Sequence, residues 1–239
     1  MSINKIPPLD AAALLKRHGL HAHKGLGQNF LQDPLALENI VEAAEILPTD
    51  TVLEIGPGLG SLTRYLAVSA KEVVAVELDP GLFAPLKAVL APYSNIRLIQ
   101  GDILKLSPGD LIEAESYLVV ANIPYYITSA VIRHLLESRP RPRGIVLTVQ
   151  KEVAQRICAG PGDMSLLALS VQIYGRPRIA ARIPAGAFFT GLWGTAPGET
   201  ARAGAETGTA CMNGTLCWCG GRCRRRTTIE KVRTAGDAK

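Results

Sequence analysis

The stretch Val52-Leu53-Glu54-Ile55-Gly56-Pro57-Gly58-Leu59-Gly60 decides the fold. Its first four residues are mostly apolar and predict a short buried strand, and the glycines after them predict a tight turn. Apolar residues at helical spacing then predict a helix over Ser61–Ala70. The free N–H groups at the beginning of such a helix can face a ligand. An ordinary strand-to-helix turn and a dinucleotide site remain alternatives, because a lone glycine-rich turn is weak evidence.

The same strand-and-helix alternation continues along the chain in both directions. Further strands are predicted over residues 72–78, 96–99, 117–121 and 144–149, and helices over 35–47, 80–90, 129–138 and 151–159. Asp33 and Pro34 form a cap and a first turn for the earliest of these helices. Repeated units with apolar strands indicate an α/β fold, a mostly parallel sheet with helices on both faces.

Acidic residues stand at the ends of three consecutive predicted strands. Glu54 precedes the first glycine, which favours the methyltransferase form of the turn and could bring a carboxylate near a methionine ammonium group. Glu77 lies about 20 residues past the glycines and could accept hydrogen bonds from both ribose hydroxyls. Asp102 follows the next strand and could accept from an adenine amino group. Each alone is typical of a loop or cap, but together they predict one nucleoside cofactor site at the carboxyl edge of the sheet.

The motif Asn122-Ile123-Pro124-Tyr125 follows the predicted fourth strand and is the most informative about chemistry. An adenine N6 is a poor nucleophile, because its lone pair is delocalised into the ring. Acceptance of its two hydrogens by the Asn122 side-chain oxygen and a nearby main-chain carbonyl would localise that pair. Pro124 would fix the turn, and Tyr125 would offer a face on which an extruded base stacks. A strand-end turn with a core tyrosine is the alternative.

With these residues assembled, the chain resembles the ribosomal RNA adenine N6,N6-dimethyltransferase family over about residues 15–189. The resemblance rests on six motifs: GQNFL (27–31), EIGPGLG (54–60), VELD (76–79), GD (101–102), NIPY (122–125) and VQKEVAQR (149–156). It implies a Rossmann-like fold that uses S-adenosylmethionine. It also implies catalytic roles for Asn122, Pro124 and Tyr125. The cofactor contacts expected from the motifs and the resemblance are Asn29, Leu31, Glu54, Gly56, Gly58, Gly60, Glu77, Asp102 and Asn122.

The resemblance further implies a target and a setting. The family dimethylates two adjacent adenines in a stem-loop near the 3′ end of 16S rRNA, so the small ribosomal subunit is the expected partner of a monomeric protein. Macrolide-resistance methyltransferases acting on 23S rRNA share the core motifs and are the nearest alternative. No secretory signal or membrane span is expected, which favours a cytoplasmic location. The run of basic residues and histidines over 16–24 is either an RNA-binding patch or a solvated helix end.

The chain departs from the family after Phe189. From Thr190 it is rich in Gly, Thr, Ala and Arg, and four of the five net positive charges lie there. We expect three parts: an N-terminal basic segment that closes over the cofactor (1–32), a catalytic domain (33–189) and a mostly disordered tail (190–239). The last strand of the sheet and the family's C-terminal helical domain are expected to be missing, as a shifted reading frame or a sequence error would produce.

Two further hypotheses concern this tail. Its four cysteines, Cys211, Cys217, Cys219 and Cys223, could hold a metal, but their spacing does not match paired zinc knuckles, so no metal site is predicted. The altered C-terminus also raises a rival function: a catalytically impaired assembly factor that binds the cofactor and ribosomal RNA but turns over poorly. The intact NIPY motif favours an active enzyme instead.

Overall fold

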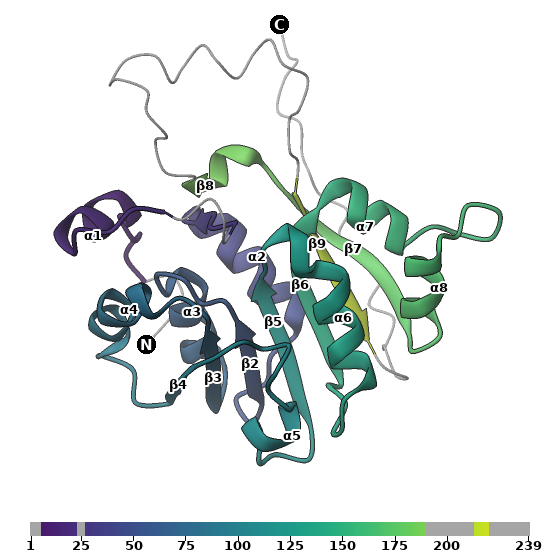
Figure 1. Ribbon diagram of the computed structural model, residues 1–239, viewed down its shortest axis with the longest axis horizontal. Helices are drawn as coiled ribbons and strands as arrows, with labels where there is room; N and C mark the ends of the chain where they lie inside the picture. The colour runs from purple at the N-terminus through teal and green to yellow at the C-terminus, as the bar shows by residue number, and fades with distance from the viewer. Residues whose placement is uncertain (1–5, 23–26, 190–212, 220–239) are drawn as a thin grey trace, which may run out of the picture.

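A computed structural model describes residues 6–22, 27–189 and 213–219 of the 239-residue chain. A seven-stranded sheet in the order β4-β3-β2-β5-β6-β9-β7 forms its centre (Figure 1). The strands are β2 (Thr51–Ile55), β3 (Glu72–Glu77), β4 (Ile96–Gln100), β5 (Tyr117–Asn122), β6 (Gly144–Gln150), β7 (Arg176–Ile183) and β9 (Asn213–Cys219). The strands predicted from the sequence lie within one or two residues of these bounds.

Strands β2 to β6 run parallel to one another, which confirms the predicted α/β class. Strands β4, β3, β2, β5 and β6 are paired side by side in that order. The segments that connect them cross over one face of the sheet or the other. The connecting helices are α2 (Pro34–Ala44), α3 (Ser61–Ser69), α4 (Phe83–Leu90), α5 (Pro108–Leu111), α6 (Thr128–Glu137), α7 (Lys151–Ile157) and α8 (Leu166–Gln172). A short 3-10 turn, η3 (Pro80–Leu82), precedes α4.

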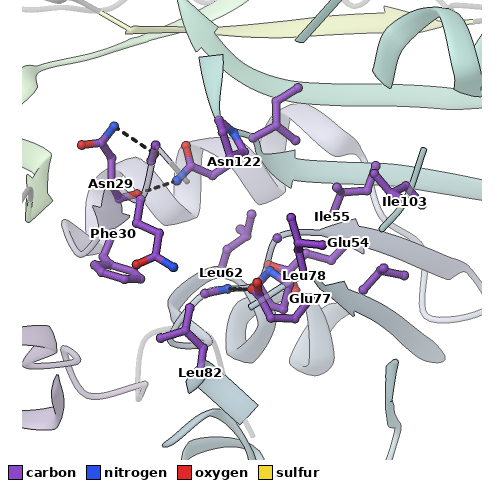
Figure 2. A pocket seen from close by; sticks show the side chains of 18 of the residues that line it. Asn29, Phe30, Glu54, Ile55, Leu62, Glu77, Leu78, Leu82, Ile103 and Asn122 are labelled. Atoms are coloured by element: carbon purple, nitrogen blue, oxygen red, sulfur yellow. Dashed lines mark hydrogen bonds between the residues drawn. The ribbon is translucent and has the colours of Figure 1, made fainter. Parts of the chain in front are cut away.

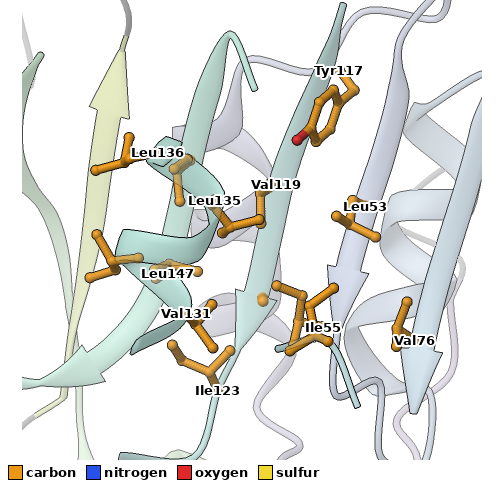
Figure 3. Close-up of a cluster of buried hydrophobic side chains, with 14 of the residues drawn as sticks. Leu53, Ile55, Val76, Tyr117, Val119, Ile123, Val131, Leu135, Leu136 and Leu147 are labelled. Atoms are coloured by element: carbon orange, nitrogen blue, oxygen red, sulfur yellow. The ribbon is translucent and has the colours of Figure 1, made fainter. Parts of the chain in front are cut away.

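Two apolar layers hold the helices on the sheet. Alternate strand residues point to opposite faces, so Val52 packs with α2 and α3, while Leu53 packs in the cluster that α6 supplies. Figure 3 shows that second cluster, with Val131 and Leu135 of α6 lying over β5. Full burial of each such side chain stabilises the fold by about 1.5–3 kcal/mol. The layers therefore fix the strand ends relative to one another.

The N-terminal part forms a smaller layer beside the carboxyl edge of the sheet. Helix α1 (Ala11–Arg17) begins at Asp10, whose side chain accepts from the Ala13 N–H at 2.9 Å. It packs in a cluster with Phe30, Leu59 and Leu82. The chain then forms β1 (Phe30–Leu31), which pairs antiparallel with β8 (Phe188–Phe189) in a sheet of its own. The end of the family-like region is thereby hydrogen-bonded to its beginning.

The predicted loss of the last strand is wrong in the described part of the tail. Residues Asn213–Cys219 form β9, which pairs antiparallel with β6 on one side and β7 on the other. A sheet ladder bonds main-chain N–H and C=O groups, so a segment that can extend is able to fill the position, and this one includes the strand-favouring residues Thr, Leu and Trp. Residues 190–212 and 220–239, on which the rest of the predicted disordered tail falls, lie outside the described residues.

Among the described residues, no helix combines the length and the apolar character needed to cross a membrane.

Candidate active site

A pocket opens where β2, β3, β4 and β5 end, at the edge where the sequence predicts the cofactor site. The segment 27–31 forms its opposite side, and we call this segment the pocket wall. The empty volume of the pocket, counted together with its open mouth, is about 1010 Å³. Figure 2 shows Glu54, Glu77 and Asn122 facing this space from three strands.

The glycine turn gives the pocket a bare floor. Gly56 and Gly58 have φ angles of +67° and +59°, which L side chains rarely adopt. A Cβ at Gly56 would meet nothing within 4 Å, whereas one at Gly58 would lie 3.2 Å from the Phe30 ring. Gly60, also predicted as a cofactor contact, does not line the pocket. Its missing side chain instead leaves room for Leu86, which would lie 3.0 Å from a Cβ there.

Glu77 ends β3 and is held by two main-chain donors. Its Oε2 accepts from the Gly58 N–H at 3.0 Å, and its Oε1 accepts from the Asp79 N–H at 2.8 Å. Burial raises the pKa of Glu77, and those two N–H groups oppose the rise. A carboxylate has about four acceptor sites, so this one retains capacity for two ligand hydroxyls. The glycine turn and the acidic strand end therefore form one hydrogen-bonded unit.

Glu54 lies at the centre of the floor and is only 1% exposed. Its Oε2 has no hydrogen-bond partner among the described residues, although it lines the pocket. Burial raises the pKa of Glu54 to about 8, with a smaller contribution from Glu77 and an opposing one from the Thr63 hydroxyl. An unpartnered buried carboxyl group favours a cationic ligand, which would supply the missing partner.

Asp102 borders the pocket after β4. Its Oδ1 accepts from the Leu104 N–H at 3.0 Å, and its Oδ2 lies 3.9 Å from the Lys105 ammonium group. These contacts hold the carboxylate at the pocket rim without burying it. Asp102 thus lies where an acceptor for a base amino group was predicted.

Asn122 ends β5 and is linked to the pocket wall. Its Nδ2 donates to the Asn29 main-chain carbonyl at 3.0 Å, a contact between residues 93 positions apart (Figure 2). This hydrogen bond fixes the orientation of the Asn122 amide, because it requires the nitrogen to face the pocket wall. The oxygen is then the end available to accept from a ligand.

The rest of the NIPY motif continues into a short turn. The Ile127 N–H donates to the Pro124 carbonyl at 3.3 Å in η4 (Tyr125–Ile127). Pro124 lines the pocket, as predicted for a residue near the reaction. The Tyr125 side chain lies outside the described atoms, so its stacking role stays a prediction. Tyr126, the next residue, lines the pocket and is 62% exposed.

The pocket therefore gathers most of the predicted residues and adds others. Of the predicted residues, nine line it: Asn29, Leu31, Glu54, Gly56, Gly58, Glu77, Asp102, Asn122 and Pro124. Sequence reasoning assigned no role to Gln28, Phe30, Leu78, Ile103 or Tyr126, which also line it. Gln28 and Phe30 lie inside the GQNFL motif, which was the one available signal for them.

Comparison with known proteins narrows the chemistry. A family described as ribosomal RNA adenine dimethylase matches residues 19–188. A protein named ribosomal RNA small subunit methyltransferase A, from Dehalococcoides mccartyi (strain CBDB1), is 49% identical over 180 residues, which are 75% of this chain. The matched region spans 62% of that relative's length.

Two solved structures share the fold and some sequence. A dimethyladenosine transferase from Plasmodium falciparum has a TM-score of 0.64 at 26% identity, over 80% of this chain and 63% of that one. The 23S rRNA methyltransferase ErmE has a TM-score of 0.66 at 27% identity, over 81% of this chain and 70% of the other. Both have a Rossmann-like methyltransferase fold, and this confirms the predicted fold class.

Proposed function

The chain belongs to the ribosomal RNA adenine dimethylase family, and on that premise we propose that it methylates N6 of adenine in ribosomal RNA with S-adenosylmethionine as donor. The observation that carries the proposal is the joint placement of Glu54, Glu77 and Asn122 around one pocket. Two carboxyl groups suit a cationic nucleoside cofactor, and an oriented amide suits an adenine amino group. An isolated glycine turn would support neither.

The residues present fit the cofactor. The unpartnered Oε2 of Glu54 suits the methionine ammonium group, and the open space beside Gly56 admits the close approach of a ligand. The free acceptor sites of Glu77 suit the two ribose hydroxyls. Asp102 suits the adenine amino group of the cofactor. When bound, S-adenosylmethionine supplies an electrophilic methyl group on a sulfonium.

Asn122 is the proposed centre of catalysis. Because its Nδ2 is bonded to the Asn29 carbonyl, its oxygen can accept one N6 hydrogen of the target adenine. A main-chain carbonyl of the NIPY turn would accept the other. The two acceptors localise the nitrogen lone pair and direct it toward the methyl group, a contribution of positioning and preorganised polarity. No strong base is needed, since the methylated nitrogen is acidic enough to lose its proton to water.

The target base needs an aromatic surface outside the polar centre. Tyr125 is the predicted stacking residue, and the exposed Tyr126 in the pocket lining is a second candidate. Base stacking on an aromatic ring contributes about 1–3 kcal/mol. RNA affinity can be measured in Tyr125→Ala and in Tyr126→Ala. The tyrosine whose substitution weakens RNA binding more is the stacking residue.

The finer substrate is two adjacent adenines near the 3′ end of 16S rRNA in the small subunit. The name of the 49% identical relative supports this choice, while the likeness to ErmE keeps 23S rRNA as the alternative. Lys16, Arg17 and His18 are exposed at the end of α1, beside the cluster that backs the pocket, and would contact phosphates. A cytoplasmic location and a monomeric state stay predictions.

The deciding experiment is tritiated-methyl transfer from S-adenosylmethionine to under-methylated small subunits and, separately, to large subunits. Transfer to small subunits alone supports the proposal, and transfer to large subunits alone replaces 16S by 23S rRNA. A second candidate function, an impaired assembly factor, is suggested by residues 190–239, which lie outside the family match over residues 19–188. Binding of cofactor and small subunits without transfer would support that candidate.

A further inference from the structure

Gln28, which the chemistry above does not use, joins the pocket wall to the acidic strand end. Its Nε2 donates to Oδ2 of Asp79 at 2.8 Å, across 51 positions of sequence. Asp79 lies two residues after the end of β3 and is 9% exposed. A hydrogen bond from an amide to a largely buried carboxylate is stronger than one between neutral groups. The contact therefore resists separation of the wall from the rest of the pocket.

Asp79 is itself fixed by two further bonds. Its Oδ1 accepts from the Gly81 N–H at 2.9 Å, and its own N–H donates to Glu77 Oε1 at 2.8 Å. The carboxylate cannot rotate away from Gln28 without losing the first of these bonds. A continuous chain of hydrogen bonds thus runs from Gln28 through Asp79 to Glu77 and Gly58.

The next residue of the wall faces the other end of the pocket. The Asn29 carbonyl accepts from Nδ2 of Asn122, the amide proposed to hold the target base. Gly27, with a φ angle of +60°, lies so close to Pro124 that a Cβ would come within 3.2 Å of it. The last two residues of the wall form β1, which is paired with β8. The wall is thus anchored at the base end and along β1, and Gln28 anchors it at the cofactor end.

We propose that Gln28 is a positioning residue that clasps the wall to Asp79 and so sets the spacing between the cofactor and the target adenine. This inference rests on the proposed function of the pocket. Because adjacent residues of one short segment contact Asp79 and Asn122, a shift of the wall changes both ends together. Loss of the clasp lowers cofactor affinity and also lowers turnover at saturating cofactor, since the Asn122 amide loses its fixed orientation.

A pair of substitutions isolates this contact. Gln28→Glu places a second carboxylate against Asp79 and raises the dissociation constant of S-adenosylmethionine by about 10- to 100-fold. Asp79→Asn alone has a small effect, because the Gln28 amide can turn its oxygen toward the new NH2 group. In the double variant, the Asn oxygen still accepts from Gly81 while its nitrogen donates to the Glu carboxylate. We expect its affinity and turnover within about threefold of the wild type.

The matched control is Gln172→Ala. That glutamine also donates hydrogen bonds through its Nε2, to the main-chain carbonyls of Ile157 at 2.8 Å and Ala159 at 3.0 Å, but it lies at the other edge of the sheet. It should leave cofactor affinity unchanged whatever it does to the melting temperature. Calorimetry with S-adenosylmethionine alone measures each affinity, and single-turnover methyl transfer measures the rate.

Hydrogen–deuterium exchange of residues 27–33 in the cofactor-free chain gives a readout that needs no activity. Exchange should be faster in Gln28→Glu and return to the wild-type rate in the double variant. A double variant as impaired as Gln28→Glu, in exchange and in affinity, overturns the clasp. A wild-type chain that binds no S-adenosylmethionine overturns the proposed function instead, and the exchange result then still decides the clasp.

Discussion

The two halves of the central sheet are built by different rules. Strands β4, β3, β2 and β5 are parallel, and their carboxyl ends carry the acidic residues and the amide of the pocket. The other edge, β6-β9-β7, alternates in direction, and among the residues whose side chains are described, none of β6 or β7 lines the pocket. We call these the site half and the edge half. Function should depend on side chains in the first and stability on main-chain pairing in the second.

The site half also carries a cost that the edge half does not. Glu54 is buried with an oxygen that lacks a partner among the described residues, which destabilises the free protein when the group ionises. In the edge half, β9 instead pairs along both of its sides. A substitution in the site half should therefore change stability and ligand binding in opposite directions, whereas one in the edge half should change stability alone.

The largest expected effect is the change in the free energy of unfolding when Glu54 is replaced by Gln. Its pKa of about 8 in the folded chain exceeds the ordinary value of 4.5, so the unfolded chain ionises first as the pH rises. Stability is then lost between about pH 4.5 and pH 8 and levels off above pH 8. Glu54→Gln removes this loss and should raise the free energy of unfolding at pH 8 by about 4 kcal/mol at most. Urea titrations at pH 5 and pH 8 measure it.

The same variant tests the trade within the site half. Glu54→Gln should weaken S-adenosylmethionine binding, because a neutral amide replaces the partner of the ammonium group. Equal or tighter cofactor binding, together with an unchanged pH dependence of unfolding, would remove Glu54 from the proposed site. Thr63→Val removes the hydroxyl that lowers the Glu54 pKa, so it should extend the loss of stability to higher pH instead of removing it.

Asn122→Ala should have the largest effect on catalysis. Loss of one preorganised acceptor reduces turnover by roughly 10²–10³-fold, equivalent to about 3–4 kcal/mol in the transition state. Cofactor affinity should change much less, since the amide faces the wall and the target base. Methyl transfer to small subunits measures turnover, and calorimetry measures affinity. Full activity in this variant would show that adenine is held elsewhere.

Deletion of residues 190–239 is the matching experiment in the edge half. It removes β9 and leaves the facing main-chain groups of β6 and β7 without their partners. We expect a loss of about 3 kcal/mol, or a fall in melting temperature of roughly 6–12 °C. Cofactor affinity measured well below that temperature should not change. An unaltered melting temperature would mean that β9 contributes nothing to the folded chain.

Glu77→Ala should give the smallest change of the four. Two ribose hydroxyls lose a charged acceptor, so cofactor binding weakens by about 1–3 kcal/mol. The Gly58 and Asp79 N–H groups also lose their acceptor, which loosens the turn. Glu77→Gln, which retains one oxygen, should fall between the wild type and the alanine variant. Unchanged affinity in calorimetry would place the ribose elsewhere.

The site half was predictable from the sequence for a physical reason. Buried parallel strands are continuous apolar runs, so Glu54, Glu77 and Asn122 could be placed at strand ends before any contact was known. The prediction was incomplete where a role depends on distant residues. Gln28 contacts Asp79 across 51 positions, and no local pattern reports such a pair. At Gly60, the φ angle of +85° and the approach of Leu86, 3.0 Å from where a Cβ would lie, both favour glycine, and its cofactor contact stays a prediction.

The edge half was much less predictable. Helix α8 was missed because it is only about two turns long and mostly apolar, with Leu166 and Leu169 exposed and no clear polar face. Strand β9 was missed because its composition resembles the polar, glycine-rich sequence around it. What holds β9 in place is the pair of neighbouring strands, and that information lies in β6 and β7 rather than in residues 213–219.

The position of β9 between two earlier strands has a consequence for how the chain folds as it leaves the ribosome. Strand β7 ends at Ile183, and β9 begins about 30 residues later at Asn213. At synthesis rates of about 5–20 residues per second, the site half is already complete for seconds before the segment that completes the sheet is synthesised. During that interval the exposed edge of β6 is open to any extended strand, including one from another nascent chain. The time taken to synthesise the residues between Ile183 and Asn213 therefore sets how long this edge stays open.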